Sequence, residues 1–140
     1  MKASEVNLFL QRGTMFYATS RSVTSPTPHF FIVLNKKSYE QTGIVVSVVT
    51  SQIENRKKLA ARYGFPASTI VTLPRGCHPC LTKDSAVDCN FVTVVSFKEM
   101  CGFGAKDFRT PDFPHEYLQR IIQGVLESPK VSDEIKAMIA

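Results

Sequence analysis

Tryptophan is absent from this 140-residue sequence, and no apolar run approaches the ~18 residues that a transmembrane helix needs. The chain also has no internal repeat and neither of the glycine-rich patterns GxxxxGK and GxGxxG, which excludes a repeat protein and the common nucleotide loops. Glu5 and Asn7 interrupt the first ten residues, where a secretory signal would need an apolar core. We therefore expect no membrane contact and a cytoplasmic location.

Acidic residues are outnumbered by basic ones. Twelve Asp and Glu stand against seventeen Lys and Arg, which leaves a net charge of +5 at pH 7. This excess suits an anionic partner, and nucleic acid is the commonest. The hydrophobic content of 44% is that of an ordinary globular protein, and the length predicts one domain over residues 1–140.

The four cysteines allow more than one interpretation. Cys77 and Cys80 enclose His78 in the segment CHPC, which has the two-residue spacing of a zinc knuckle. A zinc site would need further ligands from Cys89 and Cys101, which do not form a second close pair. Reduced structural thiols are the simpler reading, so no metal and no cofactor are expected, and a zinc module remains an alternative.

Short apolar stretches predict a small sheet. β-branched and aromatic residues favour strands, and those at 29–35 and 44–50 are almost wholly apolar, as in central strands. The expected strands cover residues 14–18, 29–35, 44–50, 68–73, a short piece within 78–90, and 91–97. The Ser-, Thr- and Pro-rich segment 19–28 and the Gly- and Pro-containing segment 101–114 are expected to be loops.

Helices are expected between these strands and after them. Ser51 and Glu54 have capping-box spacing and Gly64 is a stop signal, which predicts a helix over 51–64. Apolar residues at helical spacing predict further helices over 114–129 and 132–140, and residues 4–13 could form a short one. The predicted fold is mainly β with helices (α+β), built on a strongly curved sheet or barrel.

Polar side chains cluster where apolar strands end, which is where a sheet presents groups to a ligand. His29 opens one strand. Thr50, Ser51 and Gln52 form another group, which leads into a helix whose second turn carries Arg56. This junction is both a helix cap and a possible phosphate-binding site. A third group comprises Lys83, Asp84, Ser85, Asp88 and Asn90. A turn whose Asp and Asn side chains hydrogen-bond to the neighbouring backbone would also explain this group.

Five segments occur in an order that resembles the PemK/MazF superfamily, the toxins of type II toxin–antitoxin systems. They are GTMFYA, PHFFIVLN, VVSVVTSQ, KDSAVDCN and the tail IIQGVLESPKV, and together they span nearly the whole chain. The resemblance is closest to a diverged, little-characterised branch. It implies an SH3-like barrel over about 13–97, C-terminal helices over about 113–140, and a homodimer. It also implies metal-independent cutting of single-stranded RNA by 2′-OH attack, and an antitoxin-like protein partner.

The resemblance also assigns site residues, with one departure. Thr50 and Ser51 match a Thr-Ser pair of the toxin site, and Asp88 matches its acidic residue, but Ser85 stands where the catalytic Arg belongs. No Arg occurs between Arg75 and Arg109. The predicted catalytic residues are therefore Thr50, Ser51, Asp88, His29 for proton transfer, and Lys83 for the phosphate. The predicted RNA contacts are Gln52, Arg56, Asp84, Ser85 and Asn90.

Two functions remain open from the sequence. One is an endoribonuclease that has replaced its Arg, and the other is a catalytically inactive barrel that binds RNA or an antitoxin-like protein. Residues 19–28 are the expected groove for an extended peptide. Two surfaces are either RNA contacts or ordinary solvated and packed residues. They are the basic helix residues Arg56, Lys57, Lys58 and Arg62, and the loop residues Phe103, Lys106, Phe108 and Arg109.

Overall fold

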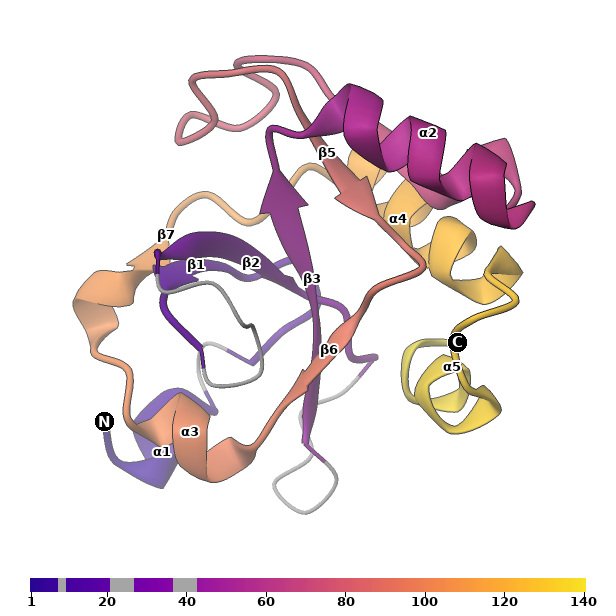
Figure 1. Ribbon diagram of the computed structural model, residues 1–140. Helices are drawn as coiled ribbons and strands as arrows, with labels where there is room; N and C mark the ends of the chain where they lie inside the picture. The colour runs from indigo at the N-terminus through magenta and orange to yellow at the C-terminus, as the bar shows by residue number, and fades with distance from the viewer. Residues whose placement is uncertain (8–9, 21–26, 37–42) are drawn as a thin grey trace.

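The computed structural model describes residues 1–7, 10–20, 27–36 and 43–140 (Figure 1). Its strands are β1 (Met15–Ala18), β2 (His29–Val33), β3 (Ile44–Thr50), β4 (Ile70–Leu73), β5 (Ser85–Asp88), β6 (Thr93–Val95) and β7 (Phe108–Arg109). Its helices are α1 (Ala3–Val6), α2 (Ile53–Tyr63), α3 (Phe97–Cys101), α4 (His115–Glu127) and α5 (Asp133–Ile139), with single 3₁₀ turns η1 (Ala67–Thr69) and η2 (Ala105–Asp107).

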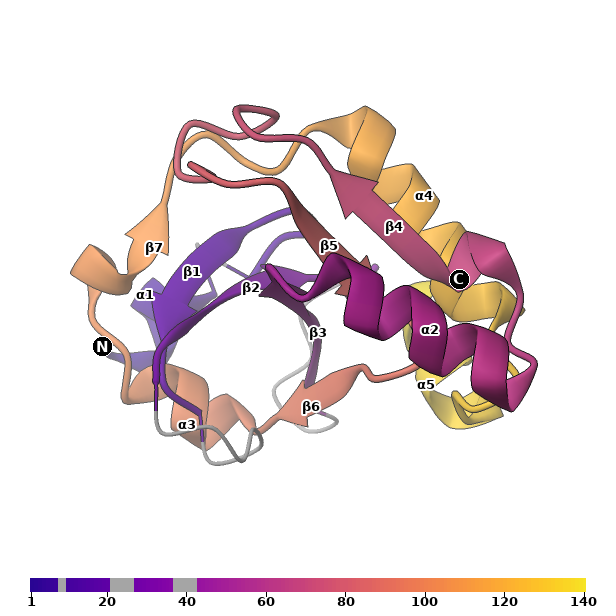
Figure 2. The same ribbon diagram turned by 45° about the horizontal axis from the view of Figure 1, so that its top comes forward.

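The described strands form one antiparallel seven-stranded sheet in the order β4-β5-β3-β2-β1-β7, with β6 also paired to β3. β3 is its central member. It pairs with β2 along one edge, and its other edge pairs first with β6 and then, at its end, with β5. Figure 2 shows the resulting strong curvature. The expected α+β class is confirmed. The sheet is open among the described residues, since β4 and β7 lie at its two ends and do not pair.

Both faces of the central strands β2 and β3 are largely buried, which explains why these strands are apolar without alternation. One core, which includes Met15, Ile32 and Val45, packs against α4 and α5. The other includes Phe16, Phe31 and Val33, and it packs against α1 and α3. In Figure 1, α4 and α5 lie on one side of the sheet beside the C-terminus, while α1 and α3 lie near the N-terminus. β2 is therefore the central strand that its composition predicts.

Several element boundaries differ from the prediction. The helix expected over 51–64 begins at Ile53, and its N-cap is Gln52 with no side-chain cap, so the capping box of Ser51 is wrong. Its stop is confirmed, because Gly64 adopts a left-handed conformation with φ 72° and ends the helix. The first helix covers only Ala3–Val6 rather than 4–13.

The segments around β6 hold three elements that the pattern missed. The strand expected over 91–97 is limited to Thr93–Val95, because Ser96 caps α3 by accepting a hydrogen bond from the Glu99 amide. The supposed loop 101–114 contains η2 and β7. In the described part of the chain, no helix has the length and apolar character needed to cross a membrane.

Candidate functional site

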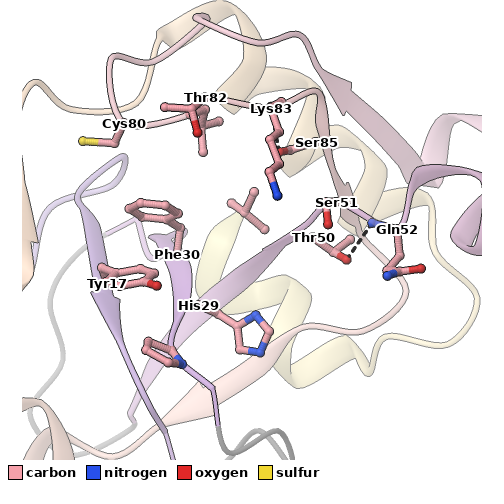
Figure 3. Close-up of a pocket in the computed structure, with 13 residues that line it drawn as sticks. Tyr17, His29, Phe30, Thr50, Ser51, Gln52, Cys80, Thr82, Lys83 and Ser85 are labelled. Atoms are coloured by element: carbon pink, nitrogen blue, oxygen red, sulfur yellow. Dashed lines mark hydrogen bonds between the residues drawn. The ribbon is translucent and has the colours of Figure 1, made fainter.

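A pocket of about 400 Å³ lies where β2 begins, β3 ends and the chain approaches β5 (Figure 3). It gathers polar, aromatic and sulfur-containing side chains from segments that are far apart in the sequence. The residues that line it are Tyr17, Pro28, His29, Phe30, Val49, Thr50, Ser51, Gln52, Cys80, Leu81, Thr82, Lys83 and Ser85. Six of the predicted site residues, His29, Thr50, Ser51, Gln52, Lys83 and Ser85, are therefore neighbours.

The antiparallel register brings these residues together. β2 pairs with β3 through Phe31 and Val48. Because the pairing is antiparallel, the first residue of β2, His29, lies beside the C-terminal end of β3. β5 pairs with β3 through Ala86 and Thr50, so Ser85 at the start of β5 lies at the same end. Strand direction thus places three predicted polar groups around one space.

Lys83 is the cation of this pocket, and its backbone is held in place. The Ser85 hydroxyl donates a 3.0 Å hydrogen bond to the Lys83 carbonyl. Ser85 is buried whereas the Lys83 side chain is exposed. In Figure 3 the Lys83 amine extends toward the space enclosed by Thr50, Ser51 and His29. Ser85 therefore positions the backbone of a cationic residue and does not itself supply a charge.

Two hydrogen-bonding groups of the pocket have no hydrogen-bond partner among the described residues. Nε2 of His29 is buried and has no hydrogen-bond partner within the described ranges. An orphaned buried imidazole nitrogen costs free energy, which a bound group can recover. The Thr50 hydroxyl is engaged, since it accepts the Gln52 amide at 3.1 Å. The exposed Ser51 hydroxyl, by contrast, makes no hydrogen bond to any described residue.

An aromatic wall faces these polar groups, and the sequence pattern gave no reason to single it out. The Tyr17 and Phe30 rings lie 4.5 Å apart between centroids, on paired residues of β1 and β2. The Arg109 guanidinium lies 5.7 Å from the Tyr17 ring centroid. Tyr17 keeps 36% of its surface exposed, the signal of a strand aromatic that is not a core residue. The two rings, tilted by 41° to each other, offer an apolar surface in the pocket that Lys83 also lines.

Three other predicted site residues lie outside this pocket, in a buried cluster at the far end of β5. The Asn90 side-chain amide donates to Thr69 Oγ1 at 2.8 Å and to Asp88 Oδ1 at 3.0 Å, and its oxygen accepts the Ser128 hydroxyl at 2.7 Å. Arg56 Nη1 is 3.7 Å from the second Asp88 oxygen. Asp88, Asn90 and Arg56 therefore tie β5 to η1, α2 and the end of α4, and their predicted catalytic and RNA-binding roles stay predictions.

Asp84, Phe103 and Phe108 have structural contacts of their own. Asp84 accepts the Arg75 amide at 2.8 Å, which closes the turn before β5. Phe103 and Phe108 are partly buried and pack against the core through Phe16, with ring centroids 5.4 and 5.7 Å away. The expected peptide groove at 19–28 lies mostly outside the described residues.

His78 of the CHPC segment is a structural residue. It is fully buried, its Nδ1 accepts the Cys80 amide at 3.1 Å, and its Nε2 therefore donates to the Pro111 carbonyl at 2.7 Å. With both nitrogens engaged, this imidazole is not presented to a metal. Within the described ranges, no three His, Cys, Asp or Glu side chains are grouped to hold an ion.

The chain was compared with protein-family models, with curated proteins and with solved structures. None of them matches it. The case for a function consequently depends on the pocket itself.

Proposed function

We propose that this pocket binds single-stranded RNA and cuts it without a metal ion, as in a MazF/PemK-like endoribonuclease. The observation that carries the proposal is the convergence of Lys83, His29 and the Tyr17–Phe30 wall on one space. A cation, a proton-transfer group and an aromatic surface are the three features that a nucleotide and its phosphate require.

The roles follow from the chemistry of each group. The Lys83 ammonium attracts the phosphate, the Ser51 and Thr50 oxygens orient it, and a base stacks on Tyr17 and Phe30. In the cleavage step the ribose 2′-oxygen bonds to phosphorus as His29 takes its proton. The bond from phosphorus to the 5′-oxygen breaks, and this oxygen is protonated by Lys83 or by water. The products are a cyclic phosphate and a 5′-OH end.

A second candidate function has an observation in its favour. Lys83 is the one cation among the lining residues described for this pocket, and a lysine is a point charge without the bidentate fork of arginine. A site with this single cation would suit a domain that binds RNA, or an antitoxin-like protein, without cutting RNA. Cleavage activity separates the two functions.

The proposal extends to the molecular context that accompanies such toxins. It includes closure of the curved sheet into an SH3-like barrel, a homodimer, an antitoxin-like protein partner and a cytoplasmic location. The net charge of +5 and a curved sheet with a hydrophobic cluster on each face are compatible with this context.

The deciding experiment is cleavage of an end-labelled, mixed-sequence RNA in EDTA by the wild type and by His29→Ala and Lys83→Ala. Loss of a proton-transfer group should slow cleavage by about 10²–10⁴-fold. Lys98→Ala is the matched control, because Lys98 is an exposed lysine on α3 and does not line the pocket.

The expected wild-type products end in cyclic phosphate, and the control should produce them at the wild-type rate. Intact RNA at high wild-type concentration would reject the nuclease and leave the binding function. Full cleavage by His29→Ala would remove the imidazole from the mechanism.

A further inference from the structure

The outer face of α2 continues from the pocket. It carries two cations that form no ion pair with a carboxylate in the described part of the chain. Gln52 belongs to the pocket lining, and its side-chain oxygen accepts the Asn55 amide at 2.8 Å. Residues three or four apart share a helix face, so Asn55, Lys58 and Arg62 form one row along α2. This row runs for most of a helix that is about 16 Å long.

The row lies opposite the side of α2 that packs on the protein. Ala60 is buried and Ile53 is half-buried against Ile70 and Ala86, whereas Asn55, Lys58 and Arg62 are all exposed. In Figures 1 and 2, α2 lies on the outside of the molecule, over β4 and β5. A ligand could therefore reach the whole row without any rearrangement of the fold.

Lys58 and Arg62 bring like charges one turn apart, which costs an isolated helix a few tenths of a kcal/mol. Neither forms an ion pair with a carboxylate in the described part of the chain, whereas Arg56 pairs with Asp88 and Lys57 with Glu54. Within α2, the two cations without an ion pair to a described carboxylate therefore both lie on the outer row. An anionic partner is the occupant that matches their charge.

An exposed aromatic residue follows Arg62 at the end of α2, on the neighbouring face of the helix. Tyr63, the last residue of α2, keeps 62% of its surface exposed, and its ring stacks on Phe65 with centroids 5.8 Å apart. A supported tyrosine ring beside cations suits stacking of an unpaired base. A purely acidic peptide would use the cations but gain nothing from this ring.

We infer that α2 is an extended binding track for single-stranded RNA, along which the strand runs after it leaves the pocket. The inference rests on the proposed RNA function and adds a second contact region to it: Lys58 and Arg62 for phosphates, and Tyr63 for a base. Alternation of cations and aromatic rings along a groove or face is typical of sequence-tolerant single-strand binding.

The test uses a fluorescent 12-nucleotide RNA with 2′-O-methyl riboses, which cannot be cut, and a trinucleotide of the same chemistry. Two contacts to single-stranded phosphates contribute about 1.4 to the slope of log K against log salt. Lys58→Ala/Arg62→Ala should lower this slope by that amount. If the variant and the wild type bind the 12-mer equally at 1 M salt, the variant then binds it about 25-fold more weakly than the wild type at 0.1 M salt. Trinucleotide binding should stay unchanged.

The matched control is Lys2→Ala/Lys98→Ala. It removes the same charge from exposed residues on the side of α1 and α3, away from α2 in Figure 1. Tyr63→Ala should weaken 12-mer binding about tenfold without changing the salt slope, and Tyr63→Phe should preserve it.

Three outcomes would overturn the inference. An unchanged slope in Lys58→Ala/Arg62→Ala, with wild-type 12-mer binding intact, rejects the track and leaves the pocket proposal standing. Equal competition by a 12-residue polyglutamate peptide shows that the face binds any polyanion. No binding of either RNA by the wild type rejects the proposed function together with the track.

Discussion

Gly124 lies in the middle of α4, where alanine would be the better helix former by about 1 kcal/mol. The tertiary structure reverses this preference. A Cβ at this position would lie 2.7 Å from Cys89 Sγ, 2.9 Å from the Ser68 carbonyl oxygen and 3.2 Å from Cys89 Cβ. One of these atoms is backbone, and the other two belong to a fully buried side chain, so none can move aside cheaply.

The size of the effect follows from these two terms. Overpacking in a well-packed core costs typically 1–3 kcal/mol, and contacts on backbone and buried sulfur place Gly124→Ala near the upper end, at about 3 kcal/mol. After the propensity gain, we expect a net loss of about 2 kcal/mol in the free energy of unfolding. For a chain of this length the melting temperature should fall by about 6 °C.

Urea denaturation followed by circular dichroism measures this loss. Gln119→Ala, on the exposed face of the same helix, is the control and should change stability by less than about 0.5 kcal/mol. Combining Gly124→Ala with Cys89→Ala removes the sulfur contact but leaves the Ser68 carbonyl, so we expect about 1 kcal/mol of favourable coupling. A Gly124→Ala protein as stable as the wild type would refute the close seating of α4 on the end of β5.

Three more changes test other parts of the structure. Asn90→Ala removes three side-chain hydrogen bonds from a buried network, and urea unfolding should show a loss of about 3 kcal/mol, whereas wild-type stability would contradict the buried network. His78→Ala should cost about 3 kcal/mol by the same measurement, with or without added zinc, because the imidazole spans Cys80 and Pro111; a loss seen only when zinc is present would restore the metal reading. Burial, followed by the charge of the neighbouring aspartate, raises the pKa of the Cys89 thiol far above its ordinary 9.0. The folded state therefore retains a proton that the unfolded chain releases, and stability should fall by up to about 1.4 kcal/mol per pH unit above pH 9, a dependence that Cys89→Ala should lack.

Local patterns were sufficient wherever one residue type explains one element. Ser132 accepts the Ile135 amide at 3.3 Å and starts α5, and Gly64 ends α2, as their positions in the sequence predict. The apolar spacing of α4 predicts its buried face, which includes Leu118, Ile121 and Val125. Such signals are local, because a cap or a helix face depends on residues within one or two turns.

The same reasoning failed where several local explanations competed. Ser51 and Glu54 have the spacing of a capping box, yet Gln52 is the N-cap and the Thr50 hydroxyl accepts its amide. Ser96 and Glu99 have the same capping spacing, and here the serine does cap the helix. Because Ser96 directly follows an apolar stretch, the pattern assigns it to the strand expected over 91–97. Whether a hydroxyl caps a helix depends on the angle at which the strand joins it, which the spacing of Ser51 and Glu54 does not contain.

The chain by itself determined that the polar residues His29, Thr50 and Lys83 would lie near strand ends, and that both faces of the central strands would be apolar. Only the tertiary structure decided which of those groups meet. Antiparallel pairing brings the ends of β2, β3 and β5 to one pocket, while strand alternation turns Asp88 away from it toward Arg56 and Asn90. The physical reason is that register and strand direction are properties of pairs of segments, and no single segment carries the information about its partner.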